Sequence, residues 1–152
     1  FKCNLTDVLA AIGLAEMKTY ENETLLRRKK IMQQYADAFS KFDWAEIPVF
    51  EDEKRKSSYH LFLLRIKNIS EQQRNDIIQK TFDSDVSVNV HFKPLPLLSF
   101  YKNLGYNISD FPVAWNNYSR EISLPVYFDL TDEQVQTVID AAVKAVEEII
   151  SK

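Results

Sequence analysis

The clearest structural signal in the chain is the stretch TDEQVQTVIDAAVKAVEEII at residues 131–150. Thr131 and Gln134 form the pattern of a capping box, in which two side chains satisfy backbone N–H groups at the start of a helix. Apolar residues then recur at the spacing of one helix face: Val135, Val138, Ile139, Ala142, Val146, Ile149 and Ile150. The stretch therefore predicts a long amphipathic helix that packs on a core.

Extended segments precede this helix in the chain. Residues 59–66 are nearly all apolar, which is typical of a strand in the centre of a sheet. Residues 122–126 form a second, shorter extended segment. Residues 86–92 alternate between apolar and polar, with Phe92 on the apolar side and His91 on the polar side. These patterns predict a small sheet of two or three strands.

Helical patterns account for most of the remaining chain. Residues 6–20 and 21–42 are both helical in pattern, and one long bent helix is an alternative because no proline or glycine separates them. A second capping box, Ser70 with Gln73, begins another helix. Strands covered by several helices predict an α/β fold, a two-layer α/β sandwich. Such a fold occurs as a free-standing module or as the smaller lobe of a larger enzyme.

Composition limits the classes of function. The chain has 152 residues, enough for one domain, and its net charge of −3 gives no attraction to nucleic acid or anionic lipid. One cysteine excludes a disulfide framework, and two glycines exclude a glycine-rich phosphate loop. No apolar run has the length of a membrane span. We expect a cytoplasmic protein, and the first residue, Phe1, predicts that the chain is processed or excised from a longer one.

The two histidines are the side chains whose charge changes near neutral pH. His60 lies within the apolar segment 59–66, which favours a buried sheet histidine with satisfied hydrogen bonds. His91 lies at the end of a predicted strand, where active-site groups concentrate. Neither belongs to a metal-ligand pattern, so we predict no metal site. Residue types and spacing alone assemble no catalytic set.

The order of five sequence blocks resembles one enzyme family. The blocks are FKCNLTDVLAAIGL at 1–14, Arg27-Arg28 followed by Tyr35, SYHLF at 58–62, VHFKPL at 90–95, and ISLPV at 122–126 with LTD at 130–132. They resemble, in order, segments of the DegT/DnrJ/EryC1/StrS family of pyridoxal-phosphate-dependent sugar aminotransferases. Together they extend over almost the whole chain.

This resemblance implies that residues 1–152 are the C-terminal small domain of a fold-type I transferase dependent on pyridoxal phosphate. It also implies that the large domain, with the Schiff-base lysine, is absent, so the chain alone is expected to be inactive and to bind no cofactor. The parent enzyme is expected to be a homodimer. It transfers an amino group, usually from glutamate, to a keto-sugar nucleotide for surface polysaccharide or aminosugar synthesis.

The resemblance also assigns site residues. Lys2 and Asn4 correspond to the segment that reaches the partner's cofactor phosphate, and the pattern leaves open which of them makes that contact. His91 and Phe92 correspond to residues near the sugar nucleotide. No catalytic residue and no metal ligand is assigned to this chain.

The alternative is a non-catalytic α/β binding or dimerisation module. A complete module has an apolar inner face on every helix, whereas a separated lobe exposes an apolar patch where its other domain docks. Candidates for that patch are Leu9, Ile12, Leu14 and Met17.

Overall fold

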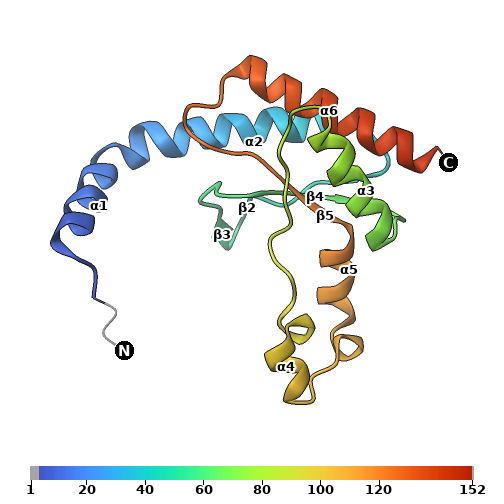
Figure 1. The fold of residues 1–152 in the computed structure, drawn as a ribbon. Helices are drawn as coiled ribbons and strands as arrows, with labels where there is room; N and C mark the ends of the chain where they lie inside the picture. Colours follow the sequence, from blue (N-terminus) through green and yellow to red (C-terminus); the bar gives the residue numbers. More distant parts are fainter. Residues whose placement is uncertain (1–3, 152) are drawn as a thin grey trace.

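The computed structural model describes residues 4–151. A three-stranded antiparallel sheet lies at its centre, in the order β1-β4-β5. The strands are β1 (Ala45–Glu46), β4 (Phe62–Ile66) and β5 (Glu121–Leu124). Three helices lie on one side of this sheet: α2 (Leu25–Phe39), α3 (Glu71–Phe82) and α6 (Asp132–Ile150). Figure 1 shows α2 and α6 running side by side above the strands. The predicted two-layer α/β fold is confirmed.

The alternation of side chains along β4 and β5 creates the two layers. Phe62, Leu64 and Ile66 are fully buried on the helix side, together with Ile122 and Leu124 of the neighbouring strand. The remaining residues of the two strands point to the opposite side, because successive side chains of a strand alternate. They form cross-strand pairs, Arg65 with Glu121 and Leu63 with Ser123. One face of the sheet is therefore core, and the other is polar. We call the second one the open face.

The amphipathic helix predicted at residues 131–150 is confirmed as α6. Thr131 and Gln134 form the capping box, and the apolar stripe from Val135 to Ile149 is buried against α2 and α3, while Ile150 at the end of the helix is exposed. The side chain of Tyr35 from α2 extends through this core and donates a hydrogen bond to the carbonyl oxygen of Pro125 at 2.9 Å. Ring contacts between Tyr35, Phe39 and Phe62 join helix and sheet.

Helix α1 (Asp7–Thr19) has a different environment, because none of its residues is buried. It begins at the Thr6 cap and joins α2 through a π-helical turn, η1 (Tyr20–Thr24). The alternative of one long bent helix is thus confirmed, and Figure 1 shows α1 projecting from the body of the molecule. Its large apolar side chains are exposed, with 57% exposure for Ile12 and 73% for Met17. We call Leu5, Val8, Leu9, Ile12, Leu14 and Met17 the α1 apolar surface.

The remaining elements are short. A hairpin of β2 (Glu51–Asp52) and β3 (Arg55–Lys56) precedes β4. An arm follows residue 92 and contains η2 (Leu95–Leu97), α4 (Ser99–Asn103), η3 (Ile108–Asp110) and α5 (Pro112–Arg120). Figure 1 shows this arm extending away from the helix layer. None of the helices within residues 4–151 is long and apolar enough to cross a membrane.

Two sequence predictions are wrong at this level. Residues 86–92 do not form a strand, because only one isolated bridge, Asn89 to Ser123, pairs this segment with the sheet. His60 is exposed and lies outside β4. Tyr59 adopts a left-handed conformation, with φ at 53°, so the chain turns there before the strand begins. At the start of this segment the buried side chain is therefore that of Tyr59 and not that of His60.

Arg74 joins α3 to the junction between α5 and β5. Its side chain is only 1% exposed, and its Nη1 atom donates to the carbonyl oxygens of Tyr118 at 2.7 Å and Glu121 at 3.2 Å. The guanidinium also lies 4.8 Å from the centre of the Tyr118 ring. This single cation therefore satisfies carbonyl groups at the end of a helix that leads directly into a strand.

Replacement of Arg74 by alanine is expected to lower the free energy of unfolding by about 2–4 kcal/mol, because buried carbonyl groups lose their donor. R74K should recover only part of this loss, since an ammonium lacks the planar fork of the guanidinium. Urea denaturation measures both. A midpoint for R74A equal to that of the unmodified chain would contradict this role.

Asp132 fixes the start of α6 to α2. Its carboxylate accepts from Arg27 at 2.6 Å and from Lys30 at 2.5 Å, and Arg27 also donates to the carbonyl oxygen of Leu130. The hydrogen bonds from Lys30 and Arg27 lower the pKa of Asp132 to about 2. Since the folded pKa lies below the unfolded one, this carboxylate stabilises the fold at neutral pH and stops doing so as the pH falls from about 4 to about 2.

D132N is therefore expected to melt at a lower temperature than the unmodified chain at pH 7, and the difference should vanish near pH 2. D129N, which removes the same charge from the adjoining loop, is the matched control and should change the melting temperature little. Thermal melts monitored by circular dichroism over this pH range make the comparison. A difference between D132N and the unmodified chain that does not depend on pH would rule out the ion pairs as its cause.

Candidate functional site

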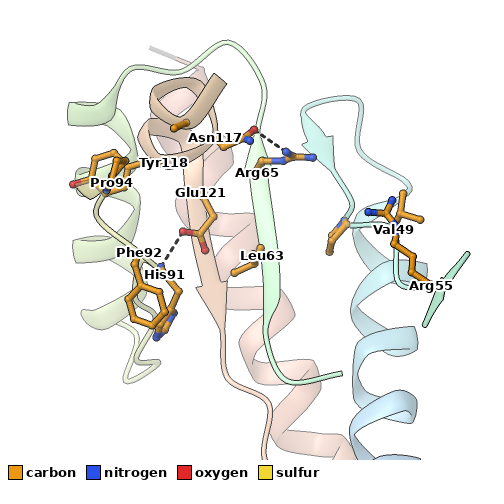
Figure 2. A pocket seen from close by; sticks show the side chains of 12 residues that line it. Val49, Arg55, Leu63, Arg65, His91, Phe92, Pro94, Asn117, Tyr118 and Glu121 are labelled. Atoms are coloured by element: carbon orange, nitrogen blue, oxygen red, sulfur yellow. Dashed lines mark hydrogen bonds between the residues drawn. The ribbon is translucent and has the colours of Figure 1, made fainter. Parts of the chain in front are cut away.

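A cavity of about 490 Å³ opens on the open face of the sheet. Leu63, Arg65 and Glu121 line it from the strands, Asn117 lines it from α5, and His91 and Phe92 line it from the segment that crosses the edge of β5. Figure 2 shows these side chains around one space, with the hairpin residue Arg55 at its far side. The cavity thus collects residues from segments that are far apart in the sequence.

Arg65 fixes the orientation of Asn117. Its Nη1 atom donates to Asn117 Oδ1 at 2.7 Å, while its Nη2 atom is paired with Glu46 Oε1 at 2.6 Å. A guanidinium can only donate, so Asn117 presents its oxygen to Arg65 and its NH₂ group elsewhere. This edge of the cavity therefore offers hydrogen-bond donors, which suits a ligand rich in hydroxyl, carbonyl or phosphate oxygens.

Glu121 is the buried acid of the cavity, with only 4% of its surface exposed. Its Oε2 atom accepts from the backbone N–H of His91 at 3.1 Å, and its Oε1 atom accepts from the Ser123 hydroxyl. Burial raises the pKa of this carboxyl, and the bonds from Ser123 and His91 and the charge of Arg74 oppose that rise. Perturbed carboxyl groups in cavities are candidates for functional roles.

His91 and Phe92 lie together at the mouth of the cavity. Their rings meet edge to face with centroids 4.6 Å apart, and Phe92 is 76% exposed. The Nδ1 atom of His91 is buried without a hydrogen-bond partner among the described residues. The alternating pattern had placed these two residues on opposite faces of a strand. Because the segment is not a strand, both line the same cavity.

Of the two predicted cofactor residues, only Asn4 is among the described residues. Lys2 lies outside the described residues. Asn4 is exposed, precedes α1 and does not line the cavity. Within residues 4–151 the structure therefore brings His91 and Phe92 together and leaves Asn4 apart from them.

The described residues do not fit a complete site for pyridoxal phosphate. This cofactor is held through a lysine amine, and no lysine within residues 4–151 lines the cavity. A metal site has no support either, since no group of three or more potential ligands lies together in the described part of the chain. The chemistry that the cavity itself offers is the binding of an oxygen-rich ligand.

Among the cavity residues that the sequence analysis did not assign to the site are Arg65, Asn117 and Glu121. For Glu121 and Arg65, the sequence pattern did contain a signal. Glu121 and Ser123 alternate with Ile122 and Leu124, so a strand next to the last helix had one polar face. Arg65 is likewise a charged residue in an apolar strand. Asn117 had no such signal, because only the fold of the arm brings it to Arg65.

The fold and the cavity define a small α/β lobe whose open sheet face carries a cavity with polar groups. A comparison with family models identifies the family. The DegT/DnrJ/EryC1/StrS aminotransferase family matches residues 1–143. The chain belongs to this family, as the five sequence blocks had indicated.

Two curated relatives carry informative names. The spore coat polysaccharide biosynthesis protein SpsC of Bacillus subtilis is 33% identical over 144 residues, which cover 93% of this chain and 36% of the relative. A UDP-4-amino-4,6-dideoxy-N-acetyl-beta-L-altrosamine transaminase of Campylobacter jejuni is 27% identical over 149 residues, which cover 98% of this chain and 39% of the relative. The chain therefore spans less than half the length of these relatives.

A solved relative has nearly the same fold. The putative sugar aminotransferase Spr1654 from Streptococcus pneumoniae superposes in its apo form with a TM-score of 0.94 at 36% identity, over 99% of this chain and 37% of the relative. Its form with pyridoxal phosphate superposes with a TM-score of 0.92 over 98% of this chain. The fold of a small domain from a fold-type I enzyme is thereby confirmed.

Proposed function

We propose that this chain is the C-terminal small domain of a nucleotide-sugar aminotransferase that depends on pyridoxal phosphate. The observation that supports this most is the match of nearly the whole chain to one part of a sugar aminotransferase that holds this cofactor. In this proposal the parent enzyme is a cytoplasmic homodimer. It moves an amino group, from glutamate, to a keto-sugar nucleotide for surface polysaccharide or aminosugar synthesis.

The cavity on the open face is the part of the substrate site that this chain supplies. Arg65 and the NH₂ group of Asn117 donate to the oxygens of the nucleotide sugar, and Phe92 covers an apolar surface of it. The name of the Campylobacter relative, a transaminase of a UDP-linked sugar, supports this ligand class. The cofactor and its lysine belong to the large domain, in agreement with a cavity that no described lysine lines. Lys2 or Asn4 contacts the cofactor phosphate of the partner subunit.

The α1 apolar surface is the docking surface for that large domain. Apolar side chains project from several sides of α1, as Val8, Ile12 and Leu14 illustrate, and a helix of this kind is normally buried. A self-sufficient binding module would bury an apolar face on every helix, whereas α1 buries no residue. This observation favours the lobe of a larger enzyme over the alternative of a non-catalytic module.

A chimera tests the proposal. This chain replaces the matching segment of the Campylobacter transaminase, whose name states its sugar substrate. The chimera is expected to retain pyridoxal phosphate and to convert it to the pyridoxamine form with glutamate, which absorbance spectra measure. A folded chimera that does not retain the cofactor would contradict the proposal. So would a specific lysine-bound cofactor formed by this chain alone.

In the chimera, the pair H91A and F92A is expected to slow the half-reaction with the amino-sugar nucleotide by about tenfold or more relative to the half-reaction with glutamate. Loss of substrate contacts removes binding for the sugar selectively. F82A, which removes an exposed ring at the end of α3 that does not line the cavity, is the matched control. Equal slowing of both half-reactions would argue against substrate contacts at these positions.

I12E tests the docking surface. In the isolated chain its free energy of unfolding should stay within about 0.5 kcal/mol of the unmodified value, because Ile12 is exposed. In the chimera it should lower the melting temperature, since a charge is then buried against the large domain. I150E is the same change at another exposed site and serves as control. Unchanged melting of the I12E chimera would exclude docking at α1.

A further inference from the structure

We propose that Glu121 is a positioning residue for the cavity. Its buried carboxylate fastens residues 89–92 to β5 and thereby sets where His91 and Phe92 stand. The link from this position to substrate binding rests on the proposed function. The positioning itself is a property of this chain and can be tested without a ligand.

The attachment consists of three hydrogen bonds at the edge of β5. Asn89 and Ser123 exchange two backbone bonds, at 2.7 Å and 3.3 Å between N and O atoms. Glu121 adds the third, by accepting the N–H of His91 on Oε2, and Figure 2 shows this bond as a dashed line. The backbone bonds end at Asn89, so Glu121 alone extends the attachment to His91.

A carboxylate suits this place because both of its oxygens accept hydrogen bonds. The Ser123 hydroxyl donates to Oε1 and the His91 N–H donates to Oε2, and neither donor has another acceptor within residues 4–151. An acid that is 96% buried is costly to ionise unless it is bonded in this way. The charged groups around it are Arg74, which bonds its backbone carbonyl, and Arg65, its cross-strand neighbour.

The position of His91 determines that of Phe92. The two rings are in edge-to-face contact, and Phe92 is otherwise mostly exposed. No other hydrogen bond to the backbone of His91 or Phe92 is present in the described structure. The bond from Glu121 is therefore the one fixed point for the two residues at the mouth of the cavity.

Amide hydrogen exchange and NMR of the isolated chain test the positioning. The His91 amide should be protected in the unmodified chain, and its proton resonance should titrate with the Glu121 carboxyl, at a pKa above the usual range for glutamate. E121Q should keep the protection, because an amide can accept from His91 and donate to Ser123, but should abolish the titration. E121A should reduce the protection by about tenfold or more. E147A, an exposed position on α6, is the control.

Protection of the His91 amide in E121A within about twofold of the unmodified chain would overturn the proposal. If E121A does not fold, the E121Q variant provides the test. A His91 amide proton resonance that titrates in E121Q as it does in the unmodified chain would also overturn the proposal.

The chimera separates this proposal from the proposed function. E121A should slow the amino-sugar half-reaction by about tenfold or more relative to the glutamate half-reaction, and E121Q should restore it in large part. Equal slowing of both half-reactions would overturn the role in substrate positioning. A chimera with the unmodified chain that processes no amino-sugar nucleotide contradicts the proposed function, while the exchange result on Glu121 stands by itself.

Discussion

The two-sided sheet is the constraint on which the rest of the molecule depends. In β4 and β5, alternate residues belong to opposite environments, so Phe62, Leu64 and Ile122 hold the helix layer while Arg65, Glu121 and Ser123 face away from it. A shift of one residue in the register would exchange the two sets and expose the core. The same alternation that folds the chain therefore also places the polar groups of the cavity.

The helix layer fixes this sheet, and in the described part of the chain two surfaces are left without a packing partner. One is the open face with its cavity, and the other is the α1 apolar surface. A helix in a protein gains most of its stability from tertiary packing, yet α1 buries none of its residues within the described chain. Since relatives with this fold are more than twice as long, both surfaces agree with the proposal that each is completed by the large domain of a parent enzyme.

Sequence reasoning predicted those features that depend on local pattern. The capping boxes at Ser70 and Thr131 and the central place of β4 follow from residues close in the chain, and all are confirmed. Residues 86–92 were mistaken for a strand, because alternation does not show whether a neighbouring strand is available. The roles of Arg74 and Glu121 were missed for a related reason. Their partners are tens of residues away and are brought to them only by the fold.

The central claim is that this chain is one lobe of a larger catalyst. Hydrogen exchange of α1, followed by mass spectrometry in the isolated chain and in the chimera with a large domain, tests it most directly. The account predicts fast exchange of α1 relative to α6 in the isolated chain, and slowing of α1 by about tenfold or more in the chimera. Protection of α1 equal to that of α6 in the isolated chain, with no change in the chimera, would contradict it.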